Sequence, residues 1–450
     1  SELFEENDLK FAPIDGANLV DQVWAADQPK VPAGQIRVHD LQYAGEKVQD
    51  KIARLQKKMQ DGKTFALLLC ALDEVAYLLN LRGNDIDFNP VFMSYAVVMT
   101  EEVHFFVDEA KFNPDVKASL PSSVIFHPYA DILTFMSGLN AQAQELKKDK
   151  KNHKIWIDAA KSNYATFNAV GFTTPADMKQ FIVTAANPLT LMKGIKNDQE
   201  VAGMKAAHIR DGAAVVKFLS WFEQQYGSLP TVDSNADKHG ESKLNEFLVA
   251  EKLEEFRSKQ DKFVGLSFDT ISSIGPNGAI IHYKPDETTS SPVVTGQVYL
   301  LDSGGQYLDG TTDITRTFYI PSPERPKPTD FQVEMNTRVL QCHIDLALSV
   351  FPAQTFGPAL DCFARRYLWE VGAEVPHGIG HGVAAHGPVH EGPCGIAKMN
   401  RGGAICSTAI VPGMILSNEP GFYENGSFGI RIENLVVVVP KQVSYKSPTP

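Results

Sequence analysis

The stretch VYLLDSGGQYLDGTTDITRTF at residues 298–318 shows how the second half of the chain is built. Asp302 ends an apolar run typical of a buried strand, and Asp313 lies eleven positions further on. A carboxylate in such a place costs free energy unless it is paired or binds a cation. A glycine-containing turn between two strands can bring both carboxylates side by side. Alone, the stretch fits equally well two aspartates that only stabilise turns, as Asp309 is expected to do before Gly310.

Histidines gather in a second stretch, VPHGIGHGVAAHGPVHEGP at residues 375–393. The density of glycine excludes a helix, so this is not the helical HExxH zinc motif. Imidazoles among glycines can approach a metal or a substrate closely, because few side chains intervene. Any one of the four histidines could instead lie in a solvated loop, and this interpretation is favoured for His386. The other three are His377, His381 and His390.

Two glutamates lie beside apolar strands in a third stretch, MILSNEPGFYENGSFGIRIENLVVVV at residues 414–439. They are Glu419 and Glu433, and strand periodicity places Arg431 on the same face as Glu433. Two acids on neighbouring buried strands repel one another unless a cation lies between them. The alternative is a surface ion pair between Glu433 and Arg431, which would contribute little to stability.

A fourth stretch, ISSIGPNGAIIHYKP at residues 271–285, places His282 at the end of an apolar run after a turn. A lone histidine there is more often structural than catalytic. Taken together, the four stretches offer four carboxylates and at least one imidazole, without sulfur. This donor set suits hard or borderline divalent cations. Its charge exceeds what one such ion neutralises, so two ions about 3.5–4 Å apart fit better.

The composition of the chain narrows its function class. It has 450 residues, is 43% hydrophobic and carries a formal net charge of -12, which disfavours nucleic acid and anionic membranes as partners. The five cysteines are scattered and include no CxxC pair, so each is expected to be a small buried apolar group in a reducing compartment. The first residues do not resemble a secretory signal, and no apolar run is long enough for a transmembrane helix. A cytoplasmic location is expected.

The chain divides into three parts. Residues 1–47 are expected to be a linker or the remnant of an N-terminal domain. Over 48–195, helices at 48–62 and in DEVAYLLNL, which should end at Gly83, alternate with the strand-like runs TFALLLCAL and KIWIDAA. A hairpin is expected for YAVVMT and VHFFVD, so this part should be a compact α/β unit. Residues 196–450 should form an α+β domain that begins with an amphipathic helix over about 198–224.

Long motifs in this sequence resemble those of the pita-bread metallopeptidases, and most closely the eukaryotic cytosolic aminopeptidase P family. The motifs include NLVDQVW at 18–24, NLRGNDIDFNPVFMSYAV at 80–97, KNDQEVAGMKAAHIRDGAA at 196–214 and NEPGFYENGSFGIRIEN at 418–434. The resemblance covers most of the chain. It implies an α+β architecture in which a smaller α/β creatinase-like domain at 48–195 precedes a pita-bread catalytic domain at 196–450.

The same resemblance implies a dinuclear metal site. Its expected ligands are Asp302, Asp313, His381, Glu419 and Glu433, with Asp313 and Glu433 bridging the ions. Mn²⁺ is the expected metal, and Zn²⁺ or Co²⁺ would also fit. The residues expected to take part in catalysis are His282, His377, His390 and Glu419. Those expected to bind substrate are Tyr423, Arg431 and Arg82.

The implied activity is hydrolysis of the N-terminal Xaa-Pro bond in peptides with proline second, with a homodimer as the possible assembly. In the mechanism that the resemblance implies, His282 stabilises the oxyanion and Glu419 shuttles a proton to the leaving nitrogen. One alternative is a prolidase-type dipeptidase, which would need a cation for the dipeptide's carboxylate. Another is a metal-free pita-bread peptide-binding module, which the retention of all five ligand types disfavours.

Overall fold

The structure, a computed structural model, describes residues 18–232, 242–399 and 407–444. Contacts divide the chain into a unit at Ser1–Ala33 and a compact unit at Gly34–Pro450. The described part of the first unit holds α2 (Leu19–Trp24), whose first turn is capped by the Asn18 side chain, and a 3₁₀ turn (Ala25–Asp27). Among the helices of the described residues, none combines the length and apolar character needed to span a bilayer.

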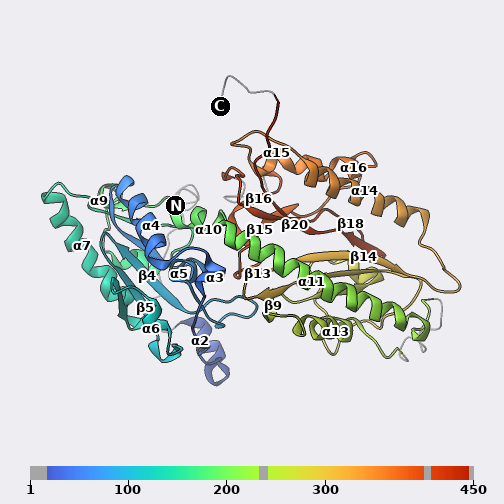
Figure 1. The fold of residues 1–450 in the computed structure, drawn as a ribbon. Coiled ribbons are helices and arrows are strands. Elements are labelled where there is room, and N and C mark those ends of the chain that lie inside the picture. The colour runs from blue at the N-terminus through green and yellow to red at the C-terminus, as the bar shows by residue number, and fades with distance from the viewer. Residues whose placement is uncertain (1–17, 233–241, 400–406, 445–450) are drawn as a thin grey trace. The chain divides into compact units, whose positions relative to one another are not determined.

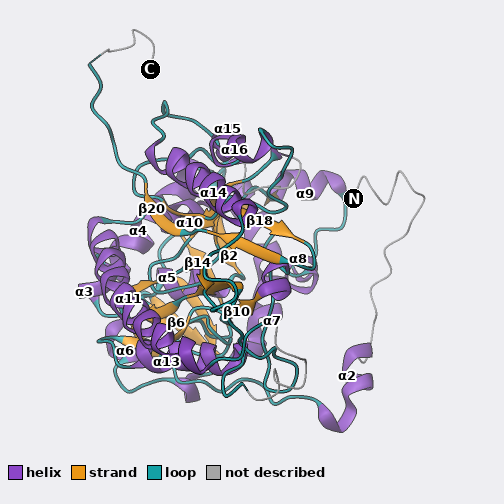
Figure 2. Ribbon diagram, turned by 90° about the vertical axis from the view of Figure 1, so that its right-hand side faces the viewer, coloured by secondary structure: helices purple, strands orange, loops and turns teal. Residues whose placement is uncertain are grey.

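A six-stranded mixed sheet forms the centre of residues 34–195, here called the middle segment (Figures 1 and 2). Its strand order is β6-β5-β4-β2-β7-β8. The predicted hairpin is confirmed, since β4 and β5 pair antiparallel, and the two other predicted strands are β2 and β7. The strands are β2 (Thr64–Leu69), β4 (Ser94–Met99), β5 (Val103–Val107), β6 (Val124–His127), β7 (Lys154–Ile157) and β8 (Ile182–Val183).

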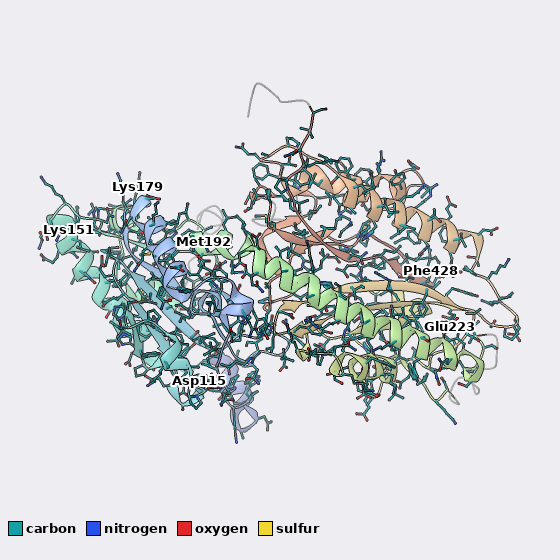
Figure 3. All side chains as sticks on the ribbon, in the orientation of Figure 1. Asp115, Lys151, Lys179, Met192, Glu223 and Phe428 are labelled. Carbon is teal, nitrogen blue, oxygen red and sulfur yellow. The ribbon has the colours of Figure 1, made fainter. Side chains whose placement is uncertain are left out.

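Helices cover both faces of this sheet, which explains why every residue of β2 is buried. Leu67 and Leu69 face the core that includes α4, whereas Ala66 and Leu68 face the core that includes α7. Charged side chains such as Lys151 and Lys179 lie outside, while Met192 is buried (Figure 3). The helices are α4 (Val48–Asp61), α5 (Leu72–Leu78), α6 (Val116–Ser119), α7 (Ile132–Lys148), α8 (Tyr164–Ala169), α9 (Pro175–Phe181) and α10 (Pro188–Gly194).

The structure corrects one boundary in this region. The helix expected to run to Gly83 ends at Leu78, because Leu81 and Arg82 form strand β3. That strand pairs with β1 (Arg37–Val38), which is followed by α3 (Leu41–Ala44). Through this pairing residues 34–47 contact the rest of the middle segment, and the assignment of residues 1–47 to a linker or an N-terminal remnant stays a prediction.

The C-terminal segment, residues 196–444, is built of antiparallel sheets between helices. Its long first helix, α11 (Asp198–Gln225), has a capping box made by Asn197 and Glu200 and matches the prediction. Three-stranded sheets are formed by β10 (Ile271–Ile274), β11 (Gln297–Ser303) and β14 (Ile314–Ile320), and by β13 (Gly310–Thr311), β12 (Gly305–Tyr307) and β9 (Phe263–Leu266). The others contain β16 (Glu391–Ile396), β15 (Gly380–Gly382), β17 (Ile415–Asn418) and β20 (Asn434–Val437), and β18 (Gly421–Glu424) with β19 (Phe428–Arg431).

Two apolar cores hold these sheets against their helices. One core joins α11 and α13 (Glu246–Ser258) to β11, and the other joins α14 (Asp330–Leu348), α15 (Gly357–Asp361) and α16 (Arg366–Trp369) to β16 and β17. Figure 1 shows α11 and α14 with strands between them. In β11, Tyr299 and Leu301 face α11, so Asp302 points to the opposite, inner side.

The cysteines only partly follow the expectation of small buried groups. Cys342 and Cys394 are buried and Cys70 is half-buried, but Cys362 is exposed because it lies on the outer side of a short 3₁₀ turn. All four are free thiols. Cys406 lies outside the described residues.

Candidate metal centre

The structure brings the five predicted ligands together from the ends of strands. Asp302 lies in β11 and pairs with Thr315 of β14, so Asp313, just before β14, comes to its side. His381 is the central residue of β15, Glu419 follows β17, and Glu433 precedes β20. Gly380 and Gly382 flank His381. A Cβ at Gly380 would lie 2.1 Å from the Ser417 carbonyl oxygen, and a Cβ at Gly382 would lie 2.2 Å from the Glu391 carbonyl oxygen. Only glycine lets β15 fit between its neighbours here.

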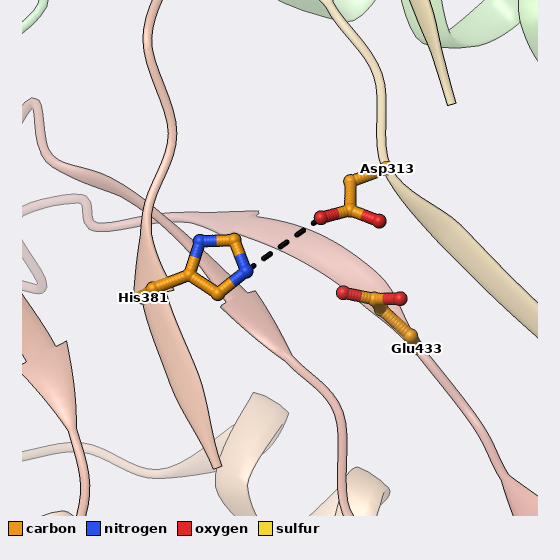
Figure 4. A group of neighbouring side chains, drawn as sticks. All are labelled: Asp313, His381 and Glu433. Carbon is orange, nitrogen blue, oxygen red and sulfur yellow. Dashed lines mark ion pairs between the residues drawn. The ribbon is translucent and has the colours of Figure 1, made fainter. Parts of the chain in front are cut away.

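The donor atoms are spaced as a divalent ion requires. Asp313, His381 and Glu433 each offer a ligand atom, and these atoms all lie within 4.8 Å of one another (Figure 4). His381 Nε2 is 3.6 Å from Asp313 Oδ2 and 3.4 Å from Glu419 Oε1. Two donors bound at about 2.1 Å to one ion are separated by about 3 to 3.5 Å. The positions therefore fit ligands of a shared ion.

The His381 ring is prepared to act as a ligand. Its Nδ1 lies 3.0 Å from the carbonyl oxygen of Gly382. A carbonyl only accepts hydrogen bonds, so Nδ1 carries the proton and Nε2 presents its lone pair to the carboxylates. Burial lowers the pKa of His381, which keeps the ring neutral.

The carboxylates crowd one another. Desolvation, followed by repulsion from Asp302 and Glu419, raises the pKa of Asp313 well above its usual range. Desolvation and then the Asp313 charge do the same for the pKa of Glu433. Desolvation raises the pKa of Glu419 to about 8, although Arg431 opposes the shift. Without a cation this cluster would hold protons near neutral pH, and a bound cation would displace them.

Arg431 is the cation that the described residues supply to the cluster. It is 2% exposed and donates from Nη2 to Asp302 Oδ2 at 2.7 Å and from Nη1 to the Tyr423 hydroxyl at 2.8 Å. The surface pair with Glu433 considered from the sequence is therefore not formed. Asp302 Oδ1 is buried and has no hydrogen-bond partner among the described residues. A buried acceptor left without a donor fits a metal ligand.

His377 and Tyr423 extend this network. His377 Nδ1 lies 2.7 Å from the Gly378 carbonyl oxygen, so it is the protonated nitrogen, and Nε2 accepts from the Tyr423 hydroxyl at 2.8 Å. Burial lowers the pKa of His377 to about 4. The hydroxyl of Tyr423 and the guanidinium of Arg431 are thus engaged with other side chains of the site.

A cleft of about 640 Å³ opens over the carboxylates. His282 and His390 are exposed residues on its walls, and Phe88 reaches it from the middle segment. His282 does not end a strand as expected, because residues Gly275–Ala279 form a 3₁₀ turn after β10 and the histidine follows in a further turn. The cleft thus joins the acids to two imidazoles that are open to a ligand.

Two hydroxyl residues of the site were not identified from the sequence. Thr315 Oγ1 donates to Glu433 Oε2 at 2.7 Å, and Ser417 Oγ donates to Glu419 Oε1 at 2.9 Å. Thr315 lies in β14, two positions after the predicted ligand Asp313, and Ser417 lies in β17, two positions before the predicted ligand Glu419. The period of two was the available signal, since it places such residues on the face of the neighbouring carboxylate.

Comparison with protein families matches both halves of the chain. Residues 27–200 match the creatinase/prolidase N-terminal domain, and residues 202–440 match metallopeptidase family M24. The second match covers more than half of the chain and includes all five predicted ligands. The chain belongs to metallopeptidase family M24. The expected pita-bread catalytic domain preceded by a creatinase-like domain is thereby confirmed.

Individual relatives within the M24 family are similar over nearly the whole chain. Xaa-Pro aminopeptidase 1 of Dictyostelium discoideum is 43% identical over 98% of this chain and 65% of its own length. The probable Xaa-Pro aminopeptidase P of Talaromyces stipitatus is 41% identical over 99% of this chain and 64% of its own length. The chain thus spans a little under two thirds of these relatives.

A solved M24 structure is similar as well. The X-prolyl aminopeptidase of Caenorhabditis elegans, described as a cytosolic enzyme with a di-nuclear active site, has a TM-score of 0.85 and 34% identity. The match covers 98% of this chain and 67% of that one. The Xaa-Pro dipeptidase of Bacillus anthracis shares the fold at a TM-score of 0.64 and 22% identity, covering 87% of this chain and 95% of its own.

Two predicted residues of this M24 chain lie differently from expectation. His386 was expected in a solvated loop, but it is 1% exposed, because its ring packs beside His39 and contacts Arg37. Arg82, expected to bind substrate, does not line the cleft. Its guanidinium is buried and donates to backbone carbonyls, including that of His386 at 2.6 Å.

The stability gained from Mn²⁺ is expected to be greater at about pH 8.5 than at about pH 7. The raised carboxyl pKa values mean that the folded metal-free chain keeps protons that the unfolded chain has released. Its unfolding free energy therefore falls as pH rises from about 4 towards the folded pKa, which for Glu419 is about 8. Thermal melting with chelator and with Mn²⁺ at both pH values measures this. Equal gains would contradict the predicted protonation, and Glu419→Gln should reduce the difference.

Proposed function

We propose that this chain hydrolyses the bond between the first residue and a proline at the second position of peptides. The proposal rests on the convergence of Asp302, Asp313, His381, Glu419 and Glu433 beneath an open cleft. The identity of 43% to a protein named Xaa-Pro aminopeptidase 1 supports the specificity. The relative described as cytosolic supports a cytosolic location.

Two divalent ions, with Mn²⁺ as the first choice and Zn²⁺ or Co²⁺ as alternatives, are the proposed cofactors. Four carboxylates face one arginine, so the site lacks positive charge, and the donors are oxygen and imidazole nitrogen. When bound, such a pair supplies Lewis acidity that activates water and polarises the scissile carbonyl. Asp302, Asp313, His381, Glu419 and Glu433 would hold these ions.

The residues around the cleft are proposed to have different roles in catalysis. Glu419 lines the cleft beside the other proposed ligands, so it is proposed to carry the proton to the departing proline nitrogen. His282 and His390 stand on the walls, where an imidazole N–H can donate to the carbonyl oxygen as negative charge develops. Tyr423 and His377 are proposed to act with Arg431 to orient Asp302, and His377 and Arg431 also line the cleft, where they can meet substrate.

The cleft offers room for peptides longer than two residues, which favours an aminopeptidase over a prolidase-type dipeptidase. A neighbouring pocket of about 340 Å³ shares Phe88, Asp269 and Lys284 with the cleft. Because the two share a wall, a chain can continue past the proline. We expect kcat/KM for Xaa-Pro-Yaa-Zaa to exceed that for Xaa-Pro at least about tenfold, given that additional contacts are used in the transition state. Preference for the dipeptide would support prolidase instead.

The activity is tested by release of the first residue from Lys-Pro-Pro or Arg-Pro-Pro. The protein is treated with chelator, assayed, and assayed again after Mn²⁺, Zn²⁺ or Co²⁺ is restored, with bound metal counted by elemental analysis. Loss and recovery of hydrolysis with about two ions per chain would support the proposal. Peptide binding without metal and without hydrolysis would show a binding module instead. The homodimer expected from the resemblance stays a prediction.

A further inference from the structure

The segment 386–391 carries His390 into the cleft, yet none of the described residues holds its imidazole by a hydrogen bond. Its ring makes no hydrogen bond to any residue that the structure describes and meets the His381 ring edge-on, with centroids 4.2 Å apart. His390 is also exposed. With no hydrogen bond of its own, the ring is placed by its backbone, which sets the rotamers open to it, and by its contact with His381. What fixes the backbone of this segment therefore helps to position the imidazole.

Arg82 of the middle segment holds one end of the segment. Its Nε donates to the His386 carbonyl oxygen at 2.6 Å, while Nη1 donates to the carbonyls of Ala76 and Leu81 at 3.0 and 2.9 Å. Arg82 is 6% exposed, so these bonds are shielded from water. The bonds to Ala76 and Leu81 fix the Arg82 guanidinium within the middle segment. The bond to the His386 carbonyl oxygen therefore fixes the position of His386 relative to that segment.

Glu391 holds the other end through a buried cluster of charges. Lys193 Nζ lies 2.8 Å from Glu391 Oε2 and 2.8 Å from Asp73 Oδ2, and Lys196 pairs with Glu391 Oε1. The side chains of the two lysines and of Glu391 are at most 5% exposed. Lys193 belongs to α10 and Asp73 to α5. Two helices of the middle segment therefore hold Glu391, the residue directly after His390.

The strands of the metal centre contact the same segment from the opposite side. Thr311 Oγ1 donates to the Gly387 carbonyl oxygen at 3.0 Å, and Gln306 Nε2 donates to it at 2.7 Å. Thr311 lies two residues before Asp313. The segment is thus held between the middle segment and the strand that leads into the predicted ligands, which sets the distance from His390 to the carboxylates.

We propose that Arg82 and the Lys193–Glu391–Lys196 ion cluster are positioning elements that set His390 against the substrate carbonyl. The middle segment then contributes to the active site, although Arg82 and Lys193 do not themselves contact the substrate. This inference rests on the proposed function, because it takes His390 as a group that contacts the scissile peptide. A purely structural role would instead lower stability without selective effect on His390.

Kinetics of Arg82→Met and Lys193→Met separate these roles. We expect kcat on Arg-Pro-Pro to fall about 10- to 100-fold, with KM and metal content little changed, because a displacement of about 1 Å can cost about that much. Arg82→Lys, which keeps one donor, should recover part of the loss. The matched control is Lys161→Met, which removes a lysine from buried Glu74 inside the middle segment and should leave kcat within about twofold.

A double-mutant cycle with His390→Ala gives the decisive readout. If Arg82 acts through His390, Arg82→Met in the His390→Ala background should cost less than about twofold more. A full additional loss, or a loss in Lys161→Met equal to that in Arg82→Met, would overturn the proposal.

Hydrogen exchange by mass spectrometry tests the holding of the segment without relying on activity. Amides of residues 384–391 should exchange faster in Arg82→Met and Lys193→Met than in wild type or Lys161→Met. Unchanged exchange would overturn the proposal even if activity fell. If wild type showed no Xaa-Pro hydrolysis, the proposed function would fail, whereas faster exchange in the two variants would still establish the positioning contacts.

Discussion

Replacing Glu433 by glutamine is expected to lower kcat/KM on Xaa-Pro peptides by about a thousandfold or more. Glu433 is 1% exposed, offers a ligand atom within 4.8 Å of those of Asp313 and His381, and is proposed to be a metal ligand. Loss of its charge should remove metal binding and with it the several kcal/mol that Lewis-acid catalysis supplies. Steady-state kinetics and elemental analysis measure the two effects together.

The metal-free Glu433→Gln chain should nevertheless be at least as stable as metal-free wild type above about pH 7. Its neutral side chain no longer suffers the desolvation and repulsion that raise the pKa of Glu433, and it can keep the contact with Thr315. Thermal melting in chelator therefore distinguishes a lost metal site from misfolding. Glu424→Gln, an exposed control in β18, should retain activity within about twofold. Full activity of Glu433→Gln would refute the ligand assignment.

Replacing Arg257 by methionine is expected to lower the free energy of unfolding by about 3–5 kcal/mol. Arg257 of α13 is 0% exposed and donates to both oxygens of Asp211 in α11, at 2.8 and 2.9 Å. The Tyr307 hydroxyl donates to the same carboxylate at 2.9 Å. The variant would leave Asp211, which is 2% exposed, as an uncompensated buried charge. Urea unfolding followed by circular dichroism measures the loss.

A double variant shows whether the cost comes from the stranded charge. Asp211→Leu combined with Arg257→Met should recover most of the stability, less about 1 kcal/mol for the Tyr307 hydroxyl left without its acceptor. Arg54→Met is the control for an exposed pair, since the Arg54 and Glu46 side chains are 42% and 23% exposed. It should cost about 1 kcal/mol or less. If Arg257→Met and Arg54→Met lowered the free energy of unfolding by the same amount, burial of the ion pair would not be the deciding factor.

Much of the fold follows from local pattern. The apolar spacing of Val48, Ile52, Leu55 and Met59 predicted α4, and the hairpin and α11 were expected where the structure has them. The end of α5 was not, because it depends on the pairing of β1 with β3. Partners more than 40 positions apart leave no local signal, and a strand of two residues has almost no periodicity.

The candidate site shows the same division. The sequence by itself predicted a donor set of four carboxylates and at least one imidazole that suits divalent cations, and the resemblance to the pita-bread metallopeptidases singled out His381 as the imidazole ligand. Tertiary structure alone decided that Arg431 pairs with Asp302, 129 positions away, and that Asp302 Oδ1 is left without a donor. It also decided that Arg82 holds His386 instead of facing the cleft, across 304 positions. Residue chemistry is a local property, whereas which buried group meets which depends on sheet register and packing, where a shift of one residue reverses every face.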